Sequence, residues 1–167
     1  FNFSARRMSM PEVPEDTFMQ ALVELVKLDQ GWVPGFENSA LYIRPFMFAT
    51  EAHVGVRPSK SFRFCIFTCP VGAYYTRPVR VKVEQHFTRA AHGGTGAAKA
   101  AGNYAGSLYP TELAKTEGYD QILWTDGATH TKVEECGTMN VGFVMDGTLV
   151  VPATSDTVLS GVTRASA

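Results

Sequence analysis

The sequence predicts an α+β protein with two successive units. Three observations lead to this fold class: one segment with helical spacing, two extended segments after it, and two later Asp-Gly pairs between extended flanks. Of the 167 residues, 45% are hydrophobic and 19% are charged, so the chain has enough apolar material for a core. We therefore expect a folded protein and not a disordered one.

A helix is expected first, within residues 14–34. Glu15 and Asp16 suit the first turn of a helix, apolar residues then recur at helical spacing, and Gly31 is expected to end it. Two extended segments complete this first unit, at residues 40–50 and 62–71.

The second unit is expected to open with a half-buried strand. Val79, Val81 and Val83 alternate strictly with polar residues, which is the pattern of such a strand. Its partners are expected in residues 121–135 and 139–153, because an Asp-Gly pair between extended flanks is a strong hairpin signal. A helix at about residues 107–117 is expected before these hairpins.

Composition excludes several classes of protein. The net charge is -1 and no long run of Lys or Arg is present, so we expect neither a nucleic-acid partner nor an anionic membrane partner. The apolar runs are too short to span a membrane, and the N-terminus does not resemble a signal peptide. Three cysteines and four scattered histidines favour reduced thiols in the cytoplasm and no metal site. Both ends interrupt a pattern, so we expect a segment of a longer protein.

A single lysine stands in the glycine-rich stretch of residues 93–106. Both common phosphate loops fail on spacing: Lys99 occupies the place of the third glycine of a dinucleotide loop, and Ala100 follows it where a Walker loop needs Ser or Thr. Composition alone favours a solvated surface lysine. However, the flanking alanines also suit a desolvated amine, which can form a Schiff base with a carbonyl group.

A carboxylate and a phenol could accompany this amine. Alternation along the strand places Glu135 on the same face as Val133 and Glu134 on the opposite face, so Glu135 is expected to point inward. A buried carboxylate needs a cation. That cation could be an arginine such as Arg89 or the protonated nitrogen of a pyridine cofactor, and Tyr104 supplies the phenol.

At these residues the sequence resembles the branched-chain amino acid aminotransferases, which are pyridoxal 5'-phosphate enzymes of fold type IV. The similar stretches include "LYIRPFMFAT", "GGTGAAKAAGNYAGSLYP", "EECGTMN" and "SGVTR", in the order of that family. The resemblance implies a two-domain α+β fold: a small α/β domain, an interdomain connection and the first part of a larger, β-rich pseudo-barrel domain. These would occupy residues 1–72, 73–80 and 81–167, respectively.

The resemblance also implies roles for residues at the cofactor. Lys99 would be the catalytic residue and form the Schiff base with pyridoxal phosphate, Glu135 would bind the ring nitrogen, and Tyr104 would bind the ring oxygen O3′. Arg89 would lie near the phosphate. The remaining cofactor-binding residues would be Thr138, Val162 and Thr163.

Substrate binding would involve both units and a second subunit. Thr138 and Met139 would line the pocket beside the ring, together with Tyr74 from the interdomain connection. The residues that would reach the pocket of the neighbouring subunit of a homodimer are Tyr42, Arg44, Val54 and Val56. For Arg44, a surface ion pair is the alternative.

The implied activity is transamination of leucine, isoleucine and valine with 2-oxoglutarate, which gives 2-oxo acids and glutamate. One alternative is another fold-type IV enzyme, such as a D-amino acid aminotransferase or an aminodeoxychorismate lyase. A further alternative is an inactive structural segment, because the phosphate-gripping arginine and the second phosphate loop of the family lie outside the sequence.

Overall fold

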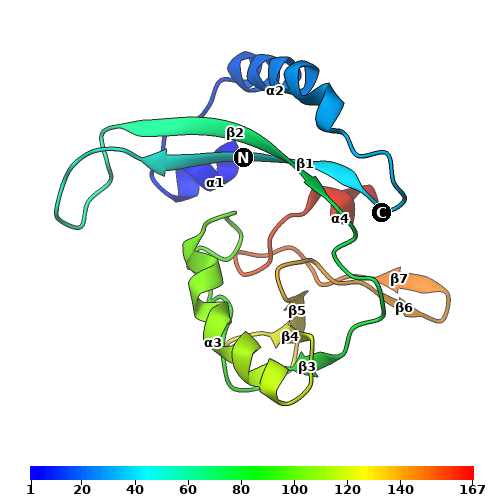
Figure 1. Cartoon of the computed structure of the whole chain (residues 1–167). Coiled ribbons are helices and arrows are strands. Elements are labelled where there is room, and N and C mark those ends of the chain that lie inside the picture. Colours follow the sequence, from blue (N-terminus) through cyan, green and yellow to red (C-terminus); the bar gives the residue numbers. More distant parts are fainter. The chain divides into compact units, whose positions relative to one another are not determined.

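The computed structural model describes all 167 residues and divides the chain into two compact units. One unit comprises Ser4–Arg77 together with Asn2, and the other comprises Pro78–Ala167, with which Phe1 and Phe3 are grouped. Both units contain helices and strands, so the predicted α+β class is confirmed (Figure 1). None of the helices combines the length and the apolar character that crossing a bilayer requires.

The Ser4–Arg77 unit contains the predicted helix and both predicted extended segments. Its elements are α1 (Asn2–Arg7), α2 (Glu15–Asp29), the 3-10 helix η1 (Gln30–Trp32), β1 (Ala40–Ala49) and β2 (Phe62–Val71). The α-helix ends two residues before Gly31, which lies within η1.

A long antiparallel hairpin dominates this unit (Figure 1). Strands β1 and β2 pair over ten positions, from Ala40 opposite Val71 to Ala49 opposite Phe62. Helix α2 packs on β2, where the rings of Phe18 and Phe64 lie 5.5 Å apart. The hairpin is thus anchored by α2, while the residues 50–61 that join its strands are mostly exposed.

The Pro78–Ala167 unit contains two small sheets. Its elements are β3 (Val81–Val83), α3 (Gly102–Thr116), β4 (Gln121–Thr125), β5 (Val133–Cys136), β6 (Phe143–Met145), β7 (Thr148–Val150) and α4 (Val162–Ser166). Strand β4 lies between β3, to which it is parallel, and β5, to which it is antiparallel. The parallel pairing follows from the crossover through α3.

The hairpin of β6 and β7 forms its own two-stranded sheet. The expectation that residues 139–153 would pair with the strand at Val81 was therefore wrong. Its turn is as predicted: Asp146 and Gly147 both have positive φ, 50° and 76°, as a tight hairpin turn requires. At Asp126 the hairpin is correct but the turn is not, because residues 126–132 form a longer loop whose amides donate to the Asp126 carboxylate.

Helix α3 packs on β4 and begins earlier than predicted. Ala114 of α3 and the fully buried Ile122 and Trp124 of β4 form the core of this unit. The helix begins at Gly102, five residues before the predicted start at Ser107. The low helix propensity of glycine hid this first turn in the sequence, whereas tertiary hydrogen bonds fix it in the structure.

Candidate functional site

The lysine loop, residues 93–101, is tied to the first turn of α3 by Asn103. Its side-chain nitrogen donates to the carbonyl oxygens of Thr95 and Ala98, both at 2.8 Å, and its oxygen accepts from the Thr95 hydroxyl at 2.6 Å. Ala98 and Ala100 are buried on either side of Lys99. The backbone that carries the lysine is therefore held firmly.

Gly96 allows this loop to approach another segment of chain closely. A methyl group at Gly96 would lie 2.6 Å from Cβ of Ala90 and 2.9 Å from Cα of Thr157, too close for any side chain. In the same place, the amide of Ala97 donates to the carbonyl oxygen of Asp156 at 2.9 Å. The glycine is needed here for close packing and not for a phosphate loop.

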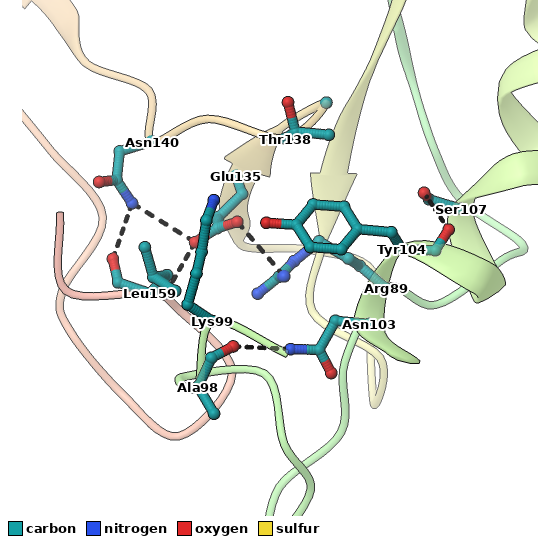
Figure 2. A pocket seen from close by; sticks show the side chains of 11 residues that line it. Arg89, Ala98, Lys99, Asn103, Tyr104, Ser107, Glu135, Thr138, Asn140 and Leu159 are labelled. Atoms are coloured by element: carbon teal, nitrogen blue, oxygen red, sulfur yellow. Dashed lines mark hydrogen bonds and ion pairs between the residues drawn. The ribbon is translucent and has the colours of Figure 1, made fainter. Parts of the chain in front are cut away.

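The Lys99 side chain leaves this loop and meets Tyr104. Its Nζ lies 5.3 Å from the centre of the Tyr104 ring, within the range of a cation–π interaction. Figure 2 shows the two side chains on adjacent segments, with Lys99 running beside Glu135. Lys99 is exposed. The expectation that the alanines would desolvate its amine was therefore wrong for this chain, because the alanines bury themselves and not the lysine.

Glu135 of β5 is almost fully buried, as predicted, with 3% of its surface exposed. Its Oε1 accepts from the Leu159 amide at 2.7 Å and lies 3.4 Å from the side-chain nitrogen of Asn140. Burial raises the pKa of Glu135, while the Leu159 amide and the charges of Arg89 and Lys99 act in the opposite direction. The carboxylate is therefore under pressure to find a further cation.

Arg89 provides one cation for Glu135. Its Nη1 lies 3.4 Å from Oε2 of Glu135, and both side chains are buried. Its Nη2 donates to the carbonyl oxygens of Gly96 and Thr157, whereas its Nε is buried without a partner. Of the two partners expected for Glu135, the arginine is the one that this chain itself supplies.

Glu134 is also buried, which the alternation rule did not predict. Trp124 of β4 faces Glu135 and Thr125 faces Val133, so a bulge leaves Glu134 without an opposite residue. A bulge rotates the strand locally and breaks the two-residue period. Oε1 of Glu134 accepts from the hydroxyl of Thr157 at 2.6 Å, and its Oε2 is buried without a partner.

These groups converge on one pocket of the Pro78–Ala167 unit (Figure 2). The pocket encloses about 390 Å³, part of which is open to solvent. Five of the predicted site residues line it: Arg89, Lys99, Tyr104, Glu135 and Thr138. Asn103, Asn140 and Leu159 also line it and were missed, although both asparagines stand within the motif stretches.

The other predicted residues do not line this pocket. Met139 pairs with Cys136 through the backbone, and Val162 and Thr163 open α4. The remaining predicted substrate residues, Tyr42, Arg44, Val54, Val56 and Tyr74, belong to the Ser4–Arg77 unit. Within that unit, Arg44 donates to the Tyr42 hydroxyl at 2.8 Å instead of forming a surface ion pair.

Comparison with protein families assigns the chain. The model of the family "Amino-transferase class IV" matches residues 1–167, the whole chain. The chain belongs to the class IV aminotransferases. Relatives in sequence include branched-chain-amino-acid transaminase 1 of Bacillus subtilis, with 50% identity over 99% of this chain and 48% of that protein. The branched-chain-amino-acid aminotransferase of Mycobacterium tuberculosis is 44% identical over 98% of this chain and 46% of that protein.

Solved structures of class IV aminotransferases share the fold. A branched-chain aminotransferase of Thermoproteus uzoniensis with norvaline matches with a TM-score of 0.80 and 27% identity, over 98% of this chain and 54% of that one. A bacterial branched-chain amino acid aminotransferase with pyridoxamine 5'-phosphate, from T.th., matches with a TM-score of 0.81 and 25% identity, over 99% and 54%. The sequence resemblance and the fold type are thus confirmed, and the chain spans about half the length of the relatives it matches.

Proposed function

We propose that this chain holds the reactive centre of a pyridoxal 5'-phosphate-dependent transaminase of leucine, isoleucine and valine, with 2-oxoglutarate as the amino acceptor. The convergence of Lys99, Tyr104 and Glu135 in one pocket carries this proposal. Relatives named as branched-chain transaminases, with 50% and 42% identity, support the substrate class.

The donor set of the pocket fits this cofactor. Oε1 of Glu135 is engaged by the Leu159 amide, whereas Oε2 has only Arg89 at 3.4 Å, longer than a strong charged hydrogen bond. Oε2 can therefore accept a bond from a protonated ring nitrogen. Glu134 and Glu135 together place two buried carboxylates against one buried guanidinium, an arrangement that favours an additional cation.

Each residue has a role in this proposal. When bound, pyridoxal phosphate supplies a carbonyl carbon for the amine and a ring that withdraws electrons from the substrate Cα. Lys99 binds the cofactor, and its freed amine removes the Cα proton as a base and returns a proton as an acid. Glu135 keeps the ring nitrogen protonated, and Tyr104 donates to the ring oxygen. Thr138 lines the pocket beside them.

The phosphate group is assigned to the backbone. Arg89 is already engaged by Glu135, Gly96 and Thr157, so we assign it to support of Glu135. The amides of Val162 and Thr163 in the first turn of α4 lack helical partners and suit an anion.

The substrate pocket is proposed to be completed across a homodimer. Val54 and Val56 are fully exposed apolar residues in the loop between β1 and β2, and Tyr42 and Tyr74 are also exposed. Such side chains suit contact with a second subunit. We assign Arg44 and Met139 to the same substrate pocket. The three free cysteines fit a reducing compartment, and we propose the cytoplasm.

The proposal is tested by trapping and then by assay. The purified chain is incubated with pyridoxal phosphate and reduced with borohydride, and the labelled peptide is mapped by mass. One pyridoxyl group on Lys99 is expected, whereas a label spread over several lysines would contradict the proposed site. Transamination of L-leucine is then compared with turnover of D-alanine and of aminodeoxychorismate, the substrates of the alternative fold-type IV enzymes.

A further inference from the structure

One irregular segment, residues 155–159, makes hydrogen bonds to the main polar groups of the pocket. The Leu159 amide donates to Glu135 at 2.7 Å, and the carbonyl oxygen of Asp156 accepts from Ala97 of the lysine loop at 2.9 Å. The carbonyl oxygen of Thr157 accepts from Arg89. The segment belongs to no helix or strand, so its position must be fixed by side-chain contacts.

Glu134 supplies such a contact from a rigid element. It lies in β5, next to Glu135, and accepts the hydroxyl of Thr157 at 2.6 Å. Both partners are buried, with exposures of 8% for Glu134 and 2% for Thr157. A short hydrogen bond to a carboxylate in a buried place is among the stronger polar contacts of a protein. It therefore connects the segment to the sheet that carries Glu135.

The carboxylate of Glu134 is costly for a residue that only fills space. Its Oε2 is buried without a partner, and burying an imperfectly paired charge costs free energy. Its charge also raises the pKa of Glu135, although burial is the larger cause. A leucine would fill the same volume without these costs. What leucine could not do is hold Thr157.

We propose that Glu134 is a positioning residue of the cofactor site, which acts by holding Thr157. Through Thr157 it fixes residues 155–159, and these orient Glu135 by the Leu159 amide and Arg89 by the Thr157 carbonyl. The inference rests on the proposed function for the nature of the ligand. The arrangement of the segment itself does not depend on that function.

The first experiment measures the segment without ligand. Amide hydrogen exchange of the full chain is followed by mass spectrometry in peptides that cover residues 94–100 and 155–160. Thr157→Val and Glu134→Leu each remove the bond and are expected to speed exchange in both peptides by roughly tenfold. Thr157→Ser and Glu134→Gln keep a donor and an acceptor and are expected to stay near the parent. Thr116→Val removes an exposed hydroxyl bond within α3 and is the matched control.

The second experiment measures the bound cofactor. Pyridoxal phosphate is added to the same proteins, and its Kd and its visible circular dichroism are recorded. Thr157→Val is expected to raise Kd by roughly tenfold and to reduce the dichroism, which reports ring orientation, while Thr157→Ser restores both. Glu134→Leu and Glu134→Gln repeat the comparison from the other partner, should Thr157→Val fail to fold.

Three results would overturn the inference. These are unchanged exchange in Thr157→Val and Glu134→Leu, failure of the Ser and Gln variants to restore the parent's behaviour, and altered exchange with unchanged dichroism and Kd. A parent protein that binds no pyridoxal phosphate would instead refute the proposed function. The exchange data would still decide whether Glu134 fixes the segment.

Discussion

Glu135 and Arg89 form a buried ion pair, with Nη1 of Arg89 3.4 Å from Oε2 of Glu135. The pair joins the end of β5 to the chain ahead of the lysine loop, and it occupies the side of the carboxylate that the proposed cofactor would use. Its geometry leads to two predictions about stability.

The first prediction concerns pH. Burial raises the pKa of Glu135 above its ordinary value of 4.5, so the folded chain holds this proton more tightly than the unfolded chain. Stability contributed by such a group falls as pH rises from 4.5 through the folded pKa. Glu135→Gln removes this loss, and its stability relative to the parent is expected to increase with pH over that window.

Urea unfolding at a series of pH values above 4.5 measures this difference. Glu112→Gln, which changes an exposed glutamate paired with Lys115, is the control and should show no such trend. A difference between Glu135→Gln and parent that stays flat with pH would contradict the prediction.

The second prediction concerns loss of the guanidinium. Arg89→Met leaves the buried Glu135 carboxylate without its cation and should destabilise the protein by about 3–5 kcal/mol. Arg6→Met breaks an exposed ion pair with Glu12 and should cost about 0–1 kcal/mol. Urea unfolding of both variants at neutral pH makes the comparison. Equal effects would show that the buried pair carries no special weight.

The third prediction separates chemistry from stability. Lys99→Ala should abolish the borohydride-trapped label and lower transaminase activity by at least about 100-fold, because no other group can replace the amine. The side chain is exposed, so the unfolding midpoint should hardly move. Lys132→Ala, also at an exposed lysine, should retain the label. Persistent labelling of Lys99→Ala at a single other lysine would place the reactive amine elsewhere.

The fourth prediction concerns the two kinds of glycine in the lysine region. Gly96→Ala puts a methyl group 2.6 Å from Ala90 Cβ and 2.9 Å from Thr157 Cα, so the loop must move and stability should fall by about 1–3 kcal/mol. Gly106→Ala meets nothing within 4 Å inside α3 and should stabilise the protein by up to about 1 kcal/mol. Thermal unfolding of the two variants should therefore shift in opposite directions, and a stabilised Gly96→Ala would refute the close packing.

Local patterns predicted the elements well where each segment decides its own conformation. Helix α2 has an acidic first turn and helical spacing, and the turn at Asp146 and Gly147 needs only residues that tolerate positive φ. The same reasoning missed the start of α3, because Asn103 and the buried core, and not helix propensity, hold the turn at Gly102.

The sequence by itself determined the fold class, the family, and the identity of the lysine, tyrosine and glutamate that the pocket contains. These depend on residue type and spacing, which are properties of the chain. Only the tertiary structure decided that Arg89 is the partner of Glu135, that Lys99 is exposed and that Glu134 is buried beside Thr157. The physical reason is that burial and pairing arise between segments far apart in sequence. A single bulge opposite Trp124 and Thr125 is enough to turn Glu134 inward against the period of its own strand.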